Sequence, residues 1–396
     1  MKKTVLITLA LTFFISSLAL SQNDEAHSAY LQAMGAPTLA QKIQLLQNYI
    51  NKYKGQGTQY ENYAYANLCI LSSQTSNLND AIDYGENALL LGGLDDFTKT
   101  QVLFVLSTIY TKQEKNLEKA KNYAMKVVEL SRVNKDKKSA TTNADQWNKL
   151  MGAGYYTHAQ AQEKAKQLKG SVSSYINSYD ILRNPQIGKD LKNVGKALYK
   201  FKFYKDAEEA FRVAYKILGD YESGSFYAKT LFKNNKKNEA LVPFKKVYAQ
   251  QRSGEVAFYI GIILAENGKK DPSVSQEAIQ YLLEASFLSP SNSEKARALA
   301  ESLFFHSREA GNYNEKVKEL TELSKKLEEM TELFNENFGD KNEDELSAKE
   351  KKEIESWLKD IEALETKIKK IEAEQNVIVQ KFNKLLEETE NRLKQR

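Results

Sequence analysis

Apolar and small residues recur with helical spacing in five stretches of the chain, in the same order each time. The stretches are DAIDYGENALLL (80–91), KAKNYAMKVVEL (119–130), DAEEAFRVAYKIL (206–218), EALVPFKKVYAQ (239–250) and EAIQYLLEASFLSP (277–290). In each, an alanine is followed four residues later by an apolar or small residue, and three residues beyond that by alanine or valine. This spacing predicts amphipathic helices that bury one face.

A second amphipathic segment precedes each of these helices and also carries a small residue. Gly195 stands twelve residues before Ala207, and Ala228 and Gly261 hold the corresponding places further along the chain. Two antiparallel helices approach most closely where their side chains are smallest. The small residues are therefore predicted to lie at helix contacts, with Leu282 filling the space between neighbouring helix pairs.

The helix pairs form a repeat of variable length. The first alanine of the pattern, or its equivalent, recurs at intervals of 39, 51, 36, 33 and 38 residues by subtraction, at Ala81, Ala120, Ser171, Ala207, Ala240 and Ala278. These pairs resemble the tetratricopeptide repeat, a helix-turn-helix unit of about 34 residues. The resemblance implies an all-α solenoid of about six units over residues 22–311, with an additional helix pair, from residue 24 to residue 53, capping its start.

A different repeat follows Gly311. Apolar residues alternate at three and four positions from Leu320 to Phe334, and a second series of about five heptads follows a charged turn. Residues 312–396 are therefore predicted to form a long helical hairpin or coiled coil. The apolar seam of the second helix consists of Ile354, Trp357, Ile361, Leu364, Ile368, Ile371, Gln375, Ile378, Phe382 and Leu385.

The second helix of this pair is predicted to be the longer, about 68 Å against about 38 Å at 1.5 Å per residue. Part of its seam must then extend beyond the first helix. The solenoid, a second copy of the chain or another protein could cover the excess, and the sequence does not choose between them. Gln375 either fixes the register of the seam or is a tolerated defect near the open end of the hairpin.

The first residues favour export. A basic start, MKK, precedes the apolar run TVLITLALTFFISSLAL and the small-x-small triplet ending at Ser21. This order is typical of a secretory signal peptide, predicted over residues 1–21, and an envelope or periplasmic location follows. A bacterial lipoprotein would carry a cysteine at the cleavage point, and this sequence has none there. No later segment has the length and apolarity of a membrane span. The single cysteine, Cys69, is predicted to be a buried core residue.

The sequence carries no recognisable catalytic or metal-binding motif. His27, His158 and His306 are far apart, no phosphate-binding glycine loop occurs, and no cysteine-histidine pairing is present. We therefore expect no enzyme activity, no cofactor and no metal. The formal net charge of +5 comes from lysines mixed with acids, and nucleic acid is rejected as a partner.

The first helices of the repeats suggest a binding surface. In tetratricopeptide proteins these helices line a concave groove, and the resemblance places in it Lys189, Lys192, Lys196, Tyr199 and Lys200, followed in the next unit by Lys229, Phe232 and Lys233. Lysines around aromatic rings would attract an acidic or carboxylate-ended peptide. The asparagines of the family's carboxylate clamp are missing at the corresponding positions, and an ordinary solvated lysine face is the alternative.

Two functions follow from this organisation. In the first, the protein is an exported bacterial scaffold of the tetratricopeptide repeat type, which holds a protein segment in its groove and uses a C-terminal coiled coil for oligomerisation or a second partner. In the second, the coil is primary, as a structural spacer or dimeric sensor arm anchored by the repeats. Truncation after Gly311 would then abolish self-association and leave a folded array.

Overall fold

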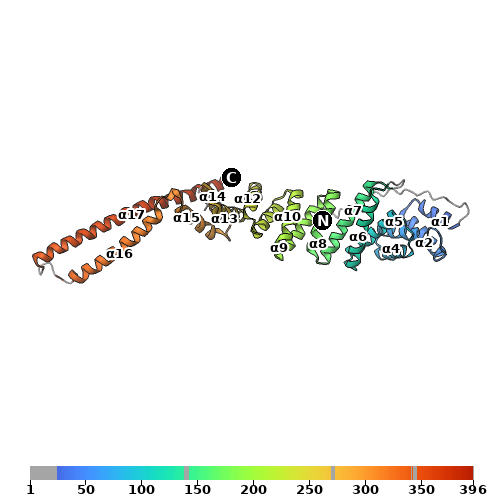
Figure 1. Cartoon of the computed structure of the whole chain (residues 1–396), viewed down its shortest axis with the longest axis horizontal. Coiled ribbons are helices and arrows are strands. Elements are labelled where there is room, and N and C mark those ends of the chain that lie inside the picture. Colours follow the sequence, from blue (N-terminus) through green and yellow to red (C-terminus); the bar gives the residue numbers. More distant parts are fainter. Residues whose placement is uncertain (1–24, 138–141, 269–272, 340, 342–345, 396) are drawn as a thin grey trace. The chain divides into compact units, whose positions relative to one another are not determined.

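Helices are the only regular elements in the part of the chain that the structure describes (Figure 1). The computed structural model describes residues 25–137, 142–268, 273–339, 341 and 346–395. The predicted fold class, an all-α helical solenoid followed by a long helical hairpin, is confirmed over these ranges. The predicted signal peptide lies outside them.

The chain divides into two compact units, one up to Thr230 and one from Leu231. The helices that lie in the first unit or begin in it are α1 Glu25–Met34, α2 Leu39–Tyr53, α3 Glu61–Ser72, α4 Leu78–Leu91, α5 Asp96–Lys112, α6 Leu117–Asn134, α7 Ala144–Lys164, α8 Leu168–Leu182, α9 Gln186–Lys200, α10 Tyr204–Leu218 and α11 Tyr221–Lys233. From α3 onward they form successive antiparallel pairs. We call the first helix of a pair helix A and the second helix B.

The second unit contains further pairs and the hairpin. Its helices are α12 Lys237–Gln250, α13 Gly254–Gly268, α14 Ser273–Leu288, α15 Ser293–Phe305, the short 3-10 helix η1 Arg308–Ala310, α16 Tyr313–Phe338 and α17 Ala348–Lys394. Gly311 lies between η1 and α16, so the change from short to long helices falls where the sequence pattern changes.

The small residues of the repeat lie at the helix contacts, as predicted. All six equivalents that open the pattern in the B helices are fully buried: Ala81, Ala120, Ser171, Ala207, Ala240 and Ala278. On the A helices, a β-carbon on Gly195 would lie 3.0 Å from the Phe211 ring. Cys69 is also fully buried, as predicted, and its Sγ lies 2.8 Å from where a β-carbon on Gly85 would stand. Close approach of two helices therefore explains why these positions are small.

Leu282 packs within its own helix pair, whereas the sequence pattern placed it between neighbouring pairs. Its Cγ would lie 2.6 Å from a β-carbon on Gly261, so the side chain packs between α13 and α14 of the same helix pair. A glycine on helix A leaves a gap that a leucine on its own helix B fills. The expected role between neighbouring pairs is not needed to explain its burial.

Four successive A helices end in the same turn. Each ends at a lysine, and the second residue after that lysine has a left-handed backbone: Glu114 (φ 54°), Lys166 (62°), Lys202 (62°) and Asn235 (63°). The following amide donates to a carbonyl five residues back, as Phe203 does to Leu198 at 2.9 Å. This is the hydrogen bond of the Schellman motif, which satisfies helix carbonyls that lack an internal partner. It occurs here without glycine at the left-handed position.

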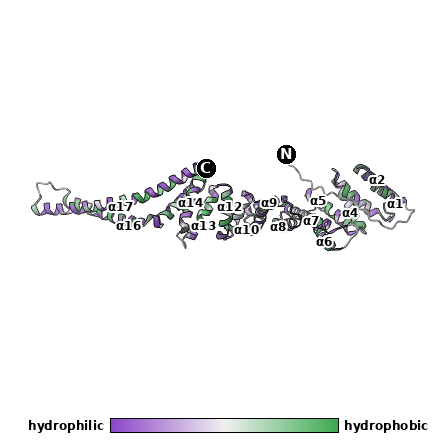
Figure 2. Ribbon diagram, turned by 90° about the horizontal axis from the view of Figure 1, so that it is seen from above, coloured by the Kyte–Doolittle hydropathy of each residue, from purple (hydrophilic) through white to green (hydrophobic). Residues whose placement is uncertain are grey.

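The hairpin helices α16 and α17 run antiparallel (Figure 1). Ser347 and Glu350 form a capping box at the start of α17, which contains 47 residues against 26 in α16. Figure 2 shows hydrophilic and hydrophobic residues interleaved along both helices, as expected of helices that bury one stripe. Ion pairs between Lys367 and Glu319 (2.9 Å) and between Lys316 and Glu374 link the two helices and mark which residues lie opposite each other.

The seam of α17 is covered within the chain itself. Its ten predicted residues are all buried or half-buried. Because Lys316 near the start of α16 pairs with Glu374, α17 extends beyond α16 from about this point onward. There Phe382 packs on Phe304 of α15, with ring centroids 5.3 Å apart, and α17 contacts α14. Of the partners left open by the sequence, α16 and the last helices of the solenoid fill the role.

Candidate protein-binding surface

Lysines on α9 lie beside acids at the start of α11. The Lys192 ammonium is 3.0 Å from Asp220 and 2.9 Å from Glu222, and Lys196 is 2.6 Å from Glu222. Burial alone would lower the pKa of Lys192, but the hydrogen bonds from Glu222 and Asp220 outweigh it and raise the pKa. The same ammonium groups, with that of Lys196 first, hold the pKa of Glu222 below its usual value. Two of the predicted groove lysines are therefore already paired with carboxylates.

An aromatic cluster lies next to these pairs. The Tyr199 ring meets Phe226 edge-on, with centroids 5.6 Å apart, and Phe226 stacks on the buried Phe211 at 5.0 Å. The ammonium groups of Lys196 and Lys229 lie 5.8 and 5.4 Å from the Phe226 centroid. Cations within about 6 Å of a ring face are attracted to it. The structure thus brings together Lys196, Tyr199 and Lys229, with Phe226 at the centre.

The other predicted residues lie elsewhere. Lys189 is exposed near the start of α9, and Lys200 is the last residue of that helix, at the turn to α10. In the second unit, Phe232 meets Tyr259 edge-on at 5.0 Å, and Lys233 ends α11. Lys200 and Lys233 thus hold the same place at the ends of two A helices.

Sequence reasoning missed both Phe226 and the acids of this surface. Phe226 lies in SGSFYAKT, where helical periodicity alone does not show which of two adjacent aromatic residues faces Tyr199.

On the preceding pairs, the Tyr156 hydroxyl donates to Asp190 at 2.8 Å, and that of Tyr175 donates to Glu163 at 2.8 Å. Burial raises the pKa of Asp190 although the hydrogen bond from Tyr156 acts to lower it. The twelve-residue spacing of small residues gives the register of helix A against helix B, and this register determines which side chains of the two helices can meet.

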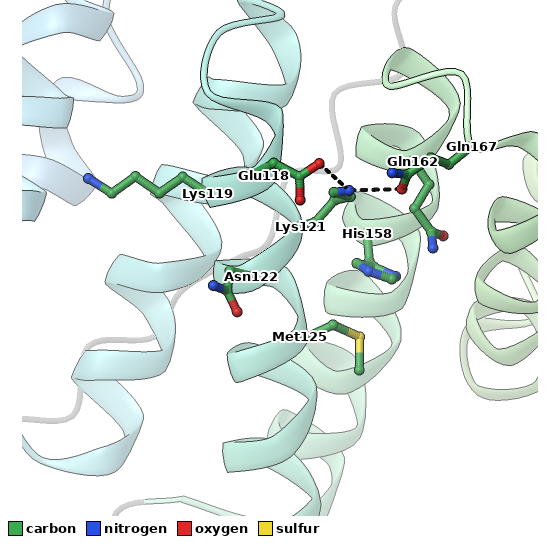
Figure 3. A pocket seen from close by; sticks show the side chains of 8 residues that line it. All are labelled: Glu118, Lys119, Lys121, Asn122, Met125, His158, Gln162 and Gln167. Atoms are coloured by element: carbon green, nitrogen blue, oxygen red, sulfur yellow. Dashed lines mark hydrogen bonds and ion pairs between the residues drawn. The ribbon is translucent and has the colours of Figure 1, made fainter.

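A polar hollow of about 560 Å³ lies between α6 and the pair formed by α7 and α8 (Figure 3). Lys121 crosses it, donating to Glu118 at 2.6 Å and Gln167 at 2.8 Å. His158 lies further in, with Nδ1 3.0 Å from the Ser174 hydroxyl. Burial, and secondarily the Lys121 charge, lowers the pKa of His158. Lys119 also lines the hollow, and its ammonium group pairs with Glu86 at 2.7 Å.

A second hollow, of about 260 Å³, lies where α17 meets α12 and α14. The buried carboxylate of Glu284 accepts a short hydrogen bond from the Tyr248 hydroxyl and one of 2.9 Å from Arg392. The last turn of α17 therefore covers this part of α14. An outside ligand could reach Glu284 only by displacing Arg392.

No group of three or more histidine, cysteine or acidic side chains in the described ranges is arranged to hold a metal ion. The thiol of Cys69 is buried, and burial raises its pKa. Over the same ranges, no helix combines the length and apolarity needed to cross a bilayer.

No protein-family model matches the sequence, and no curated protein matches it. Similar solved structures include a tetratricopeptide repeat protein from Parabacteroides merdae, 13% identical over 70% of this chain and 98% of that one, with a TM-score of 0.34. Another is a signal transduction ATPase with a tetratricopeptide repeat sensor from Pyrococcus horikoshii (15%, 71% and 46%, 0.30), and a third is the apo form of RapI (14%, 81% and 99%, 0.33).

Proposed function

We propose that this chain is a non-enzymatic protein-interaction scaffold, an exported protein of the tetratricopeptide repeat type. We further propose that it holds a segment of a partner protein over the Phe226 cluster, defined as Lys192, Lys196, Glu222, Phe226 and Lys229. The observation that carries the proposal is that Glu222 pairs with two ammonium groups, one of which also lies over the Phe226 ring. This arrangement combines charge-assisted hydrogen bonds with an amphipathic contact, as peptide-binding surfaces do.

An acidic partner segment fits this surface best. The ammonium groups of Lys192 and Lys196 already bind one carboxylate, that of Glu222. Because the Glu222 side chain is 44% exposed, a partner carboxylate can compete with it for these lysines. Lys192, Lys196 and Lys229 against Asp220 and Glu222 give the surface a charge of +1, and exposed Lys189 adds to it. The excess is small, so the proposal also relies on contact with the Phe226 ring.

Export to the envelope supplies the setting of this proposal and rests on the first 21 residues. Mass spectrometry of the protein recovered from the envelope fraction of a diderm host should find a mature chain that begins at Gln22. A chain retained in the cytoplasm with Met1 intact would contradict export without bearing on the binding surface.

Site-specific crosslinking tests the binding surface in the full chain. A photoreactive phenylalanine analogue at position 226 should yield one reproducible crosslinked partner from native envelope extract, and the same analogue at Arg212, on helix B of the preceding pair, should not. A synthetic peptide of the captured segment should then bind the purified protein, and Lys196→Glu with Lys229→Glu should weaken binding at least about tenfold. Equal capture from both positions, or undiminished peptide binding by the double variant, would reject the Phe226 surface.

The spacer alternative loses support from the coverage of the seam. Ile371 and Phe382, which a dimeric coil would share with a second chain, are already buried in this one. Dimerisation through this seam would require displacing α16 or α14. We therefore do not propose the coil as the primary function.

A further inference from the structure

Three turns of the first unit lie side by side and form one surface, which we call the turn edge: residues 112–117, 164–169 and 200–206. The contacts between turns are direct. The Lys164 ammonium is 2.6 Å from Glu114, and the Lys169 ammonium is 4.0 Å from the centroid of the Phe203 ring. Each turn joins helix A to helix B of one pair, so the turn edge consists of helix ends and loops.

The turn edge is strongly basic. The segments KAKQLK (164–169) and KFKFYKD (200–206) hold six lysines and one aspartate, a net charge of +5. The turns at the opposite ends of the same helices, RNPQ (183–186) and GDYE (219–222), hold one arginine and two acids, a net charge of −1. Charge is therefore separated between the two ends of the helices. Four turn-edge lysines make no ion pair within the described part of the chain: Lys166, Lys200, Lys202 and Lys205.

Two aromatic side chains stand exposed among these lysines. Phe201 is 62% exposed and Phe203 is 44% exposed, on either side of Lys202 at the left-handed residue of the turn. Neither ring belongs to the buried cluster of this helix pair, which includes Leu198, Ala207 and Phe211. Exposed phenylalanine is unfavourable in water, and its position between lysines calls for a partner that is both anionic and apolar.

We infer that the turn edge is a membrane-contact surface, which binds the headgroup layer of a bilayer containing anionic lipids. Lysine ammonium groups would bind lipid phosphates while the rings of Phe201 and Phe203 reach the boundary with the acyl chains. Lysine side chains suit this position because their apolar stems can lie beside the rings with the charge among the headgroups. The contact is peripheral.

A bilayer fits these observations better than an acidic protein. The exposed lysines and rings of the turn edge lie on loops at helix ends, outside the polar hollow that Gln167 lines beside this edge. A headgroup layer requires no hollow, because lipids rearrange around the residues that enter it. The turn edge also includes neither Phe226 nor Glu222, so membrane binding leaves the proposed partner surface accessible and can fail independently of it.

Vesicle sedimentation with the full mature chain tests the inference. We expect binding to phosphatidylcholine vesicles containing about one third phosphatidylglycerol, little binding to pure phosphatidylcholine, and weakening as salt is raised. The double variant Phe201→Ser with Phe203→Ser should lower the partition coefficient about tenfold or more, and so should Lys166→Glu with Lys202→Glu. Lys351→Glu with Lys359→Glu, the same charge change on exposed positions of α17, should bind as the unaltered protein does.

Circular dichroism of each variant checks that the helices remain folded. Binding that ignores lipid charge, or double variants that bind like the unaltered protein, would overturn the inference. Polyglutamate serves as the competing ligand, a model of an acidic protein segment. If it binds the chain more tightly than anionic vesicles do, and the phenylalanine variant retains that binding, the turn edge is a site for acidic protein and the membrane inference is rejected.

Discussion

Arg392 in the last turn of α17 donates to the buried carboxylate of Glu284 on α14 across 2.9 Å, joining residues 108 positions apart. Tyr248 of α12 donates to the same carboxylate. A buried carboxylate is tolerated only where hydrogen bonds and an opposite charge replace its water. The end of the hairpin is therefore attached to the solenoid through polar groups, in addition to the Phe382 contact.

Removing the cation should loosen this attachment. Arg392→Ala leaves Glu284 without its charged partner, and we expect the free energy of unfolding of the second unit to fall by about 1–3 kcal/mol, less than for a fully buried pair because Arg392 is 37% exposed. Hydrogen exchange of the α17 amides after Phe382 should accelerate. Lys394→Ala, two residues away on an exposed side chain, is the matched control and should have little effect.

Gln375 lies where α17 passes from α16 to the solenoid, and its Nε2 is buried without a hydrogen-bond partner in the described part of the chain. A buried polar atom without a partner is unfavourable, so Gln375→Leu should stabilise the hairpin by about 1 kcal/mol. Urea unfolding followed by the fluorescence of Trp357, in a Trp147→Phe background, would measure this. Destabilisation would show that the amide is needed at this position.

The close approach at Gly261 predicts a large effect from one methyl group. Gly261→Ala should destabilise the α13–α14 pair by about 1–3 kcal/mol, because the new β-carbon would stand 2.6 Å from Leu282 Cγ. The double variant Gly261→Ala with Leu282→Ala should then be less destabilised than the sum of the two single variants. Additive effects in thermal unfolding would mean that the two residues do not share this space.

The left-handed turn residues predict a gain. Lys202→Gly should raise the free energy of unfolding, because glycine adopts φ of 62° without the steric cost that lysine has. The greater entropy of glycine in the unfolded chain offsets part of this gain, so the net increase should be about 0.5–1 kcal/mol. Lys205→Gly removes the same charge from the first turn of α10 and should destabilise instead. Thermal melts of the two variants should therefore shift in opposite directions.

His158 predicts a pH dependence of stability. Its folded pKa is lowered by burial and by Lys121, so the unfolded chain binds a proton first as pH falls. Stability should be fully present above the unfolded pKa of about 6.5 and decline as pH drops below it toward the lower folded pKa. His158→Gln should reduce this decline between pH 7 and pH 5, measured as the midpoint of urea unfolding. An unchanged pH profile would indicate that His158 stays accessible to protons in the native state.

The repeat was predictable because packing leaves a local trace in the sequence. Residues such as Ala207 and Ala278 must be small where helices touch, and the spacing to Gly195 gives the register of the partner helix. The long seam of α17 is likewise a local pattern. These features depend on a helix and its neighbour in the chain, which periodicity captures.

The partners of charged and aromatic groups were not predictable in the same way. Glu222 reaches Lys196 across 26 residues, and the choice of Phe226 over Phe232 as the neighbour of Tyr199 depends on how helices stack. Nor does any local pattern reveal that Arg392 would meet Glu284. This contact changes the truncation experiment, because removal of residues after Gly311 would uncover Glu284 and Phe304, so point variants of the full chain are the better test.

The division of the α17 seam between α16 and the last solenoid helices has a mechanical consequence. A single uninterrupted helix runs from Ala348 to its attachment on α14, and residues on both sides of Gln375 are held by contacts. A force applied near Ala348 would act through a stiff arm of about 50 Å, the length of helix from there to Phe382, and arrive as torque on α14 and α15. A partner that binds the start of α17 would thereby twist the terminal helix pair from a distance.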